Sequence, residues 1–442
     1  MGWYNSNWQF RKKITIDNTK VNADLTDFPI YVDLSDLGSD FFNNVKADGG
    51  DIRITKADGT TELAREVVNI DTSGLTGEVH FKADALGSTT DTEFYIYYGN
   101  AAASDYAVTD TYGRNNVWTD YDGVYHLQGN TTNSAGTTYS EQMDGTSSSA
   151  GKIYGAYDFD GSSDELITSY QGFSGTSTFG CSMWFNRGSG GSIQPMLAGV
   201  SSTLGSANEN FYLMLANSKT NVQVAIKTGG STSYTSTTTN TTTINAGTWY
   251  YSSVWYDGSN LYNKINNSAA ASSTATGLLN TNTTDGLDFA HWKAHSSYWY
   301  DGLLDEIRFT TTPKNEHWYS TEYNNQNSAS TFYSAGAQET SQINIISISP
   351  AHNSTGNAVD TNLVITYDNN VTAGTGSLTV TQRDGLIIGN GFTGKIGEMI
   401  LTNENLSQDT IEKVEGYLAW KWFGINNPLP DSHPYKLRRP VI

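Results

Sequence analysis

The chain has 442 residues, with 45 acidic and 25 basic side chains and a formal net charge of −20 at pH 7. This length exceeds that of one ordinary β-sandwich and suggests about three domains, each able to bury its own core. So acidic a protein repels polyanions, and its short basic runs at residues 11–13 and 438–439 lie near opposite ends of the chain. Nucleic acid is therefore not an expected partner.

The composition predicts an all-β protein. Charged residues make up only 16% of the chain, Gly occurs 43 times, and Ser, Thr and Asn fill long stretches, which is typical of short strands joined by polar turns. No segment approaches the roughly 18 uninterrupted apolar residues of a membrane span, so membrane insertion is not expected. The single cysteine, Cys181, has no possible disulfide partner in the chain, and its alternating setting predicts a small core residue on a strand.

The first residues bear on how the protein leaves the cell in which it is made. Residues 1–5 lack the charged region and apolar run of a secretory signal. Together with the starting Met, this favours packaging into a virus particle and release by lysis. A signal removed during processing is the alternative.

Residues 1–104 are expected to form an N-terminal β-sandwich module. Apolar residues alternate with polar or amphipathic ones at 28–34, as in a half-buried strand. Further strands are predicted at 51–54 and 93–98, with a turn signal at 58–59 between them.

Four stretches of this module resemble a family of unknown function. They are residues 8–14, 28–29, 50–53 and the closing residues 97–100, with the sequence Tyr-Tyr-Gly-Asn. In that family such a module commonly precedes a concanavalin-like domain. The resemblance implies no established chemistry.

Residues 105–340 carry the motifs of a second β-sandwich. In chain order these motifs are residues 124–127, 156–162, 184–185, 249–258 and 301–309. They resemble the laminin-G/concanavalin-like superfamily, which implies a jelly-roll sandwich of antiparallel strands.

Two local signals add further elements to this domain. The Asp257-Gly258 turn predicts a hairpin whose return strand covers residues 260–265. Thr312 followed by Pro313 predicts the start of a short helix that continues to Gln326.

The C-terminal part resembles pieces of two domains. Residues 341–382 are similar to the opening of a bacterial immunoglobulin-like domain, of which less than half is present. Residues 383–442 combine a strand with a helix and resemble the closing elements of a second concanavalin-like domain. These two segments could complete one another, complete the first module or pair with another chain.

An amphipathic helix is predicted over residues 407–423. Ser407 is a suitable N-cap, and Asp409 in the first turn complements the helix dipole. The apolar stripe of this helix consists of Ile411, Val414, Leu418 and Trp422. Because so short a helix is marginal alone in water, we expect it to dock on a β-surface as an assembly or closure element.

Catalytic motifs are not expected. A glycoside hydrolase needs two carboxylates facing one cleft, roughly 5 to 9.5 Å apart. The clearest acidic pair, Asp305 and Glu306, occupies neighbouring positions of a predicted strand, where side chains point to opposite faces. His291 and His295 are four residues apart but have no accompanying Glu, so no zinc-protease site is predicted.

Calcium is the one cofactor that the sequence suggests. Asp158, Asp160 and Asp164 surround the turn at residues 161–163, and hard cations prefer clustered carboxylate and carbonyl oxygens. The alternative is an ordinary acidic hairpin turn in contact with solvent.

A sugar-binding surface is suggested by an aromatic loop. The chain contains 27 Tyr and 11 Trp, and aromatic faces stack on sugar rings. Trp292, Tyr298, Trp299 and Tyr300 crowd the segment before the strand that begins at Asp301. The alternative is that Trp299 or Tyr300 begins this strand and packs inward.

These features together favour a non-enzymatic surface protein of a bacterial virus, from its tail, a fibre or the capsid exterior. The chain resembles such proteins in its modular β composition, and we expect it to bind host-surface glycans and to assemble into oligomers or with other virion proteins. The alternative is a secreted bacterial adhesin or a wall-associated carbohydrate-binding protein, located outside the cell or on its surface. A glycoside hydrolase or lyase is the least favoured class.

Overall fold

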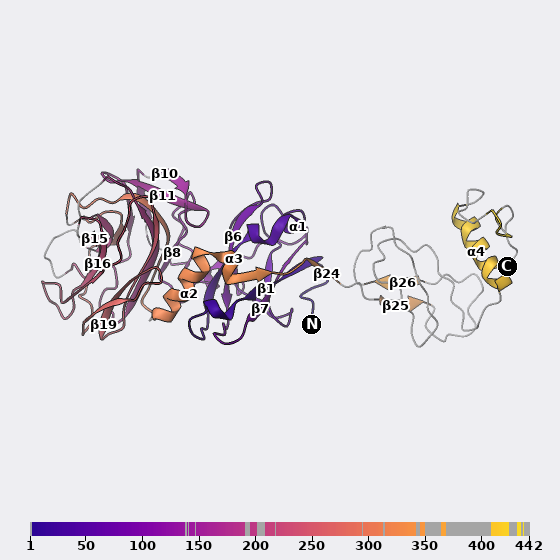
Figure 1. Ribbon diagram of the computed structural model, residues 1–442, viewed down its shortest axis with the longest axis horizontal. Helices are drawn as coiled ribbons and strands as arrows, with labels where there is room; N and C mark the ends of the chain where they lie inside the picture. The colour runs from indigo at the N-terminus through magenta and orange to yellow at the C-terminus, as the bar shows by residue number, and fades with distance from the viewer. Residues whose placement is uncertain are drawn as a thin grey trace. The chain divides into compact units, whose positions relative to one another are not determined.

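The computed structural model divides into two compact units, Met1–Ser341 and Gln342–Ile442 (Figure 1). The structure describes residues 2–137, 139, 141–145, 147–190, 195–200, 208–216, 218–293, 295–312, 314–341, 345–349, 364–367, 408–423, 431–434 and 436. The fold is all-β with few helices, as the composition predicts. None of the helices in these ranges is long and apolar enough to cross a membrane.

The N-terminal module is a sandwich of two antiparallel sheets. Its apolar residues alternate so that one face of each sheet packs on the core of the module, and the rings of Phe81 and Phe94 meet across this core at 5.0 Å. The smaller sheet has the order β2-β6-β5 and the larger one the order β23-β1-β7-β3-β4, with β24 also paired to β1. The strands are β1 (Phe10–Ile16), β2 (Phe28–Asp33), β3 (Arg53–Lys56), β4 (Glu62–Leu63), β5 (Arg65–Asp71), β6 (Thr76–Ala83) and β7 (Thr92–Tyr98), and the module also contains helix α1 (Gly38–Phe42).

The larger sheet is completed by residues that follow the second sandwich in the chain. β23 (Tyr333–Ala335) and β24 (Glu339–Thr340) both pair antiparallel with β1, in the register Ile14 to Ala335 and Phe10 to Thr340. The chain therefore leaves the N-terminal module, forms the sandwich and returns. This return fastens the two sandwiches into the first compact unit.

The second sandwich consists of an eight-stranded and a seven-stranded antiparallel sheet. Cys181, Met183 and Phe185 on one strand are buried in the core between the sheets, which confirms the prediction for Cys181. The eight-stranded sheet has the order β10-β11-β22-β13-β18-β19-β20, with β8 paired to β22. Its strands are β8 (Gly123–Tyr125), β10 (Ser147–Ala150), β11 (Gly155–Asp160), β13 (Phe179–Arg187), β18 (Trp249–Tyr256), β19 (Asn260–Ile265), β20 (Ala271–Thr274) and β22 (Asp301–Thr310).

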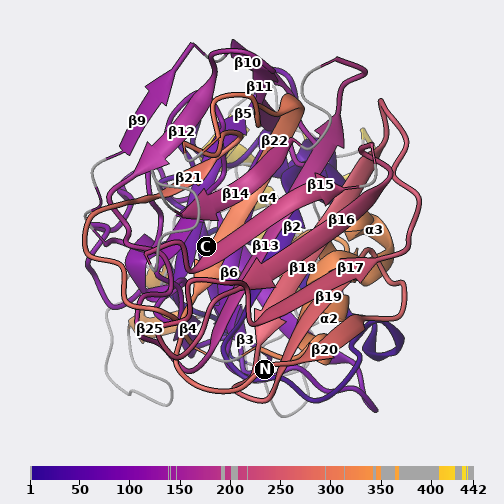
Figure 2. The same ribbon diagram turned by 90° about the vertical axis from the view of Figure 1, so that its left-hand side faces the viewer.

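The seven-stranded sheet forms the side of the first unit away from the N-terminal module and faces the viewer in Figure 2. Its order is β17-β16-β15-β14-β21-β12-β9. Its strands are β9 (Glu141–Asp144), β12 (Glu165–Thr168), β14 (Met196–Val200), β15 (Phe211–Ala216), β16 (Asn221–Ile226), β17 (Ser236–Asn240) and β21 (Leu287–Phe289).

The hairpin between β18 and β19 agrees with its prediction. Asp257 accepts hydrogen bonds from the backbone N–H groups of Ser259 and Asn260, and Gly258 has a φ of 91°, a conformation that favours glycine. The return strand covers Asn260–Ile265, as expected.

Helix α2 (Glu316–Asn327) lies between the two sandwiches and is followed by α3 (Ala329–Phe332) (Figure 1). The prediction that this helix starts at Thr312 was wrong. Asn315 is the N-cap instead, because its backbone is extended and its side chain accepts a hydrogen bond from Trp318 N at 3.1 Å. Trp318 then packs on Phe28 of the N-terminal module, with ring centroids 4.9 Å apart.

The second unit contains three described elements. β25 (Ile345–Ser349) pairs antiparallel with β26 (Val364–Tyr367), and α4 covers Gln408–Phe423, which confirms the predicted helix. Ile411 of the expected apolar stripe is 37% exposed. The predicted cap, Ser407, and most of the segments expected to resemble immunoglobulin-like and concanavalin-like pieces lie outside the described residues.

Candidate functional site

A group of buried ionisable side chains lies where the N-terminal module meets the second sandwich. We call it the junction cluster. Each of its side chains is at least nine-tenths buried, and both sandwiches contribute members. The junction cluster consists of Glu66, Glu78, His80, His126, Asp305, Glu306, Arg308 and Glu322.

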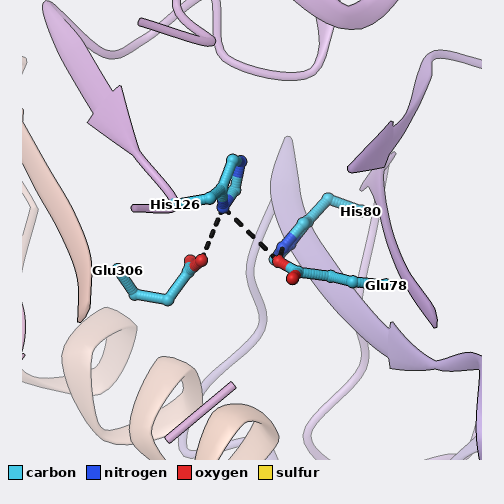
Figure 3. Close-up of side chains that lie close together, drawn as sticks. All are labelled: Glu78, His80, His126 and Glu306. Atoms are coloured by element: carbon cyan, nitrogen blue, oxygen red, sulfur yellow. Dashed lines mark hydrogen bonds and ion pairs between the residues drawn. The ribbon is translucent and has the colours of Figure 1, made fainter. Parts of the chain in front are cut away.

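Four of these side chains converge on one point (Figure 3). Glu78 and His80 are two residues apart on β6, so they share one face of the strand. His126 follows β8 directly, and Glu306 lies on β22. One nitrogen or oxygen atom from each of the four lies within 4.8 Å of those of the others.

A β-bulge places the last of these residues. Leu304 and Ile307 both belong to the core of the second sandwich, although three positions separate them. The pairing of β13 with β22 shifts between Ser182 and Trp184, and Glu306 has a positive φ of 50°. The bulge therefore inserts an extra residue into β22 at this point.

Because of the bulge, both acids of the predicted pair lie outside that core. Asp305 accepts a hydrogen bond from Ile153 N at 2.8 Å, and Glu306 contacts His126. The expectation that Asp305 and Glu306 point to opposite faces was wrong, since strict alternation fails where a strand is bulged. Both side chains are fully buried, so they do not face a cleft.

Direct contacts link the four converging side chains. His126 Nδ1 lies 2.5 Å from Glu306 Oε1 and 3.4 Å from Glu78 Oε1. His80 Nε2 lies 2.7 Å from the same Glu78 oxygen. Arg308 donates a hydrogen bond of 2.6 Å to the other oxygen of Glu306 and also pairs with Glu322.

A second layer of hydrogen bonds holds these groups in place. His126 Nε2 lies 3.3 Å from Glu66 Oε2. Glu66 in turn accepts hydrogen bonds of 2.6 Å from Trp118 Nε1 and from the Ser134 hydroxyl. Gln128 donates its side-chain N–H to Glu78. His80 Nδ1 is buried and has no partner among the described residues.

The protonation preferences of the four groups differ. Burial raises the pKa of Glu78 well above its ordinary value, and the charge of Glu306 adds to the rise. Burial lowers the pKa of His80 well below its ordinary value. Burial also acts to lower the pKa of His126, but Glu306 and Glu66 outweigh it and raise that pKa. For Glu306, burial acts to raise the pKa, but His126 and Arg308 hold it below the ordinary range.

A polar cavity of about 180 Å³ borders the cluster. Glu66 and His126 line it together with Arg65, Arg114 and Asn130. The cavity gives water and small ions a place beside the buried imidazole of His126.

The three aspartates predicted to bind calcium form a hydrogen-bonded turn. Asp160 accepts hydrogen bonds from the backbone N–H groups of Ser162 and Ser163 and from both hydroxyls. Asp164 accepts one from Asp160 N at 3.1 Å, and Asp158 is exposed. The donors of the turn thus occupy the Asp160 carboxylate, and calcium binding here stays a prediction.

The four residues of the predicted aromatic loop have different surroundings. Tyr300 is fully buried in the core of the sandwich, as the alternative for this loop anticipated, so its ring offers no face to a ligand. Trp299 is half-buried and stacks on His291, with ring centroids 3.5 Å apart. Trp292 and Tyr298 lie together at 5.7 Å.

Trp292 and Tyr298 belong to a continuous line of rings, which we call the aromatic strip. Tyr212 contacts Trp292 at 5.8 Å and Tyr234 at 4.7 Å, and Tyr298 stacks on His295 at 3.8 Å. Sequence reasoning missed Tyr212 and Tyr234. The signal for Tyr212 was its place on β15 beside Leu213, whose side chain lies in the core, because neighbouring strand residues face opposite sides.

Comparison with known families agrees with two of the resemblances noted in the sequence, those of the N-terminal module and of the second sandwich. Residues 159–318 match the concanavalin A-like lectin/glucanases superfamily. Residues 48–138 match the family described as Domain of unknown function (DUF2341). The junction cluster draws on both regions, since Glu66, Glu78, His80 and His126 lie in the second match and Glu306 in the first.

Solved structures with a similar course of the chain include the botulinum neurotoxin serotype D ligand binding domain in complex with N-acetylneuraminic acid. It is 9% identical, with a TM-score of 0.39, over 47% of this chain and 51% of that chain. Domain 4 of AbnA, a GH43 extracellular arabinanase from Geobacillus stearothermophilus, in complex with arabinotriose, is 15% identical, with a TM-score of 0.37, over 46% of this chain and 98% of that chain. The chain thus spans about half the length of the neurotoxin domains that it matches. A search of curated proteins gave no significant match.

Proposed function

We propose that the protein is a non-enzymatic glycan-binding protein of a virion surface, and that its concanavalin-like sandwich recognises carbohydrate through the aromatic strip. The observation that carries this proposal is the line of five rings from Tyr234 to His295. In this line, Tyr212 lies on β15 of the seven-stranded sheet, and the other four rings lie in segments next to β17 and β21. Membership of residues 159–318 in a superfamily named for lectins and glucanases supports it.

The strip has the properties of a sugar platform. Aromatic faces stack on the apolar faces of sugar rings, and rigid rings lose little conformational entropy on binding. Trp292 and Tyr212 are buried and support the partly exposed rings of the strip, and Trp292 is fixed over Gly199, where a Cβ atom would lie 3.3 Å from the indole ring. Tyr234, His295 and Tyr298 are partly exposed beside it. The Trp292 Nε1 donor is buried and lacks a partner in the described part of the chain. A ligand oxygen can accept a hydrogen bond from it if the ligand displaces one of the partly exposed rings beside it.

The position of the strip leaves it accessible to a ligand on another surface. The seven-stranded sheet lies on the side of the first unit away from the N-terminal module, so that module does not cover the strip (Figures 1 and 2). A ligand presented on a host surface can therefore approach the strip without obstruction by the N-terminal module.

Glycan-array binding of the full chain tests the proposed recognition. Tyr298→Ala and Tyr234→Ala are expected to weaken binding about tenfold each, since loss of one stacking face costs on the order of 1.4 kcal/mol. Tyr154→Ala is the matched control, because Tyr154 is 52% exposed and lies outside the strip. Equal binding by all three variants, or no glycan bound by the wild type, would overturn the proposal.

The proposed location has a separate test. The acidic surface and modular β composition support a virion protein, and mass spectrometry of purified virus particles from the source should then detect the chain. Detection only in the cell-wall fraction or the culture medium would favour a bacterial adhesin instead.

A further inference from the structure

The junction cluster contains the donor set of a transition-metal site. Two imidazole nitrogens and two carboxylate oxygens, from Glu78, His80, His126 and Glu306, lie within 4.8 Å of one another. A zinc ion bound at about 2.0–2.2 Å from each of four ligands would separate neighbouring ligand atoms by roughly 3.4 Å. Small side-chain movements around an ion would therefore complete the site.

The outer contacts of these side chains are those of metal ligands. Ligating histidines usually donate their second N–H to a carboxylate, which fixes the ring and its tautomer. His126 directs Nδ1 toward Glu78 and Glu306, and its Nε2 lies 3.3 Å from Glu66. Hydrogen bonds from Trp118 and Ser134 fix the Glu66 carboxylate, and Glu66 in turn fixes the orientation of the His126 ring.

The junction cluster contains more acidic than basic side chains, which favours binding of a cation. Five carboxyl groups meet one fully buried guanidinium and two imidazoles, and Lys152 lies half-buried near Asp305 at the edge of the cluster. A buried carboxyl group avoids an uncompensated charge either by holding a proton, as burial favours for Glu78, or by pairing with a cation, and a divalent ion supplies two positive charges at the centre of the group. The five carboxyl groups are those of Glu66, Glu78, Asp305, Glu306 and Glu322.

We propose that Glu78, His80, His126 and Glu306 bind a zinc ion that fastens the N-terminal module to the second sandwich. Mixed nitrogen and oxygen donors suit zinc, whereas calcium and magnesium prefer oxygen alone. The four protein donors fill a tetrahedral shell, and they are buried, so the ion is structural. The cavity beside Glu66 and His126 provides its path of entry.

Metal analysis of the full chain is the first experiment. Protein saturated with zinc and freed of excess metal by gel filtration should contain about one equivalent of zinc by mass spectrometry. X-ray absorption at the zinc edge should show only nitrogen and oxygen neighbours, including two imidazoles. After chelation, the melting temperature should fall and should recover with zinc but not with calcium or magnesium.

Variants assign the ion to these residues. Glu78→Gln and His80→Gln should lose the bound zinc and the rise in melting temperature on zinc addition. Glu165→Gln and His291→Gln are the matched controls, because Glu165 and His291 form another Glu–His pair, 2.8 Å apart, away from the cluster. These controls should retain both properties.

Two results would overturn the proposal. One is a folded wild-type chain that retains no zinc and whose melting temperature does not respond to it. The other is zinc retention by Glu78→Gln and His80→Gln at the wild-type level. Should the two variants fail to fold, the metal content and absorption spectrum of the wild type decide the question alone.

Discussion

His126 Nδ1 lies 2.5 Å from Glu306 Oε1, although 180 positions of the chain separate the two residues. The second nitrogen of His126 faces Glu66 of the N-terminal module at 3.3 Å. One imidazole thus connects a bulged strand of the second sandwich with the smaller sheet of the first. Arg308, which pairs with Glu306 and with Glu322 on α2, extends this link to the helix between the modules.

Arg308→Met should strongly destabilise the first unit. Arg308 is fully buried between two carboxylates, and its removal leaves them without their guanidinium partner. Breaking a buried pair in this way costs about 3 to 5 kcal/mol of unfolding free energy. Urea unfolding followed by tryptophan fluorescence measures the loss.

Lys13→Met is the control for Arg308→Met. Lys13 and Glu93 form a pair 3.0 Å apart whose side chains are 32% and 34% exposed. Because water screens such a pair, its loss should cost less than about 1 kcal/mol. Equal losses of unfolding free energy in the two variants would show that the buried pairs of Arg308 stabilise the protein no more than an exposed ion pair does.

The two sandwiches should lose protection from hydrogen exchange together. Trp318 on α2 packs on Phe28 of the first module, and its indole N–H donates to Tyr121 at 3.2 Å. Trp318→Ala should therefore cost about 3 to 5 kcal/mol and speed exchange of amides in β7 and β15 alike. Faster exchange in only one of the two strands would show that the modules unfold separately.

Polysaccharide cleavage is not expected. Asp305 and Glu306 are fully buried and engaged by Ile153 N and by His126 and Arg308, so neither carboxyl group reaches a sugar ring. A panel of polysaccharides incubated with the protein should release no new reducing ends. Turnover that Glu306→Gln abolishes would contradict this expectation.

Much of the fold could be predicted because the signals are local. Alternation at residues 28–34 predicted β2, and the Asp257-Gly258 turn fixed both the hairpin and its return strand. The helix after β22 was predicted but its start was not, since Asn315 outcompetes Thr312 as N-cap. Capping depends on backbone geometry that a short motif does not determine.

The junction cluster could not be predicted, because its members come from five elements spread along the sequence, namely β5, β6, the end of β8, β22 and helix α2. The only local sign was the spacing of Glu78 and His80, which places both on one face of a strand. Asp305 and Glu306 were expected on opposite faces of the strand, since nothing in the residues around them signals a bulge. The aromatic loop could be identified from its run of Trp and Tyr residues, but Tyr212, which contacts Trp292 of this loop, lies on a strand far away in the sequence.

Asp288→Asn should stabilise the protein above neutral pH. Asp288 lies on β21, its side chain is 4% exposed, and its nearest charged partner is Lys293 at 3.4 Å. Burial raises the pKa of Asp288 from its ordinary value of 3.8 to about 7, with Lys293 opposing the rise. The folded protein therefore keeps a proton that the unfolded chain has lost between these two values.

The sign of the effect follows from this difference in bound protons. Where the folded state binds more protons than the unfolded state, stability falls as pH rises, so the wild type loses stability from about pH 4 to about pH 7. A shift of this size corresponds to at most about 4 kcal/mol, and loss of the Lys293 pair reduces the gain in the variant. Urea unfolding at pH 4, 5.5 and 7.5 should show the advantage of Asp288→Asn growing with pH. Asp58 provides the contrast, because hydrogen bonds from Thr61 and Thr60 lower its pKa from 3.8 to about 2. Asp58→Asn should therefore lose stability relative to the wild type as pH rises from about 2 to about 4, and the difference should stay constant at pH 5.5 and 7.5. An advantage of Asp288→Asn that is the same at all three pH values would mean that Asp288 titrates alike in the folded and unfolded states.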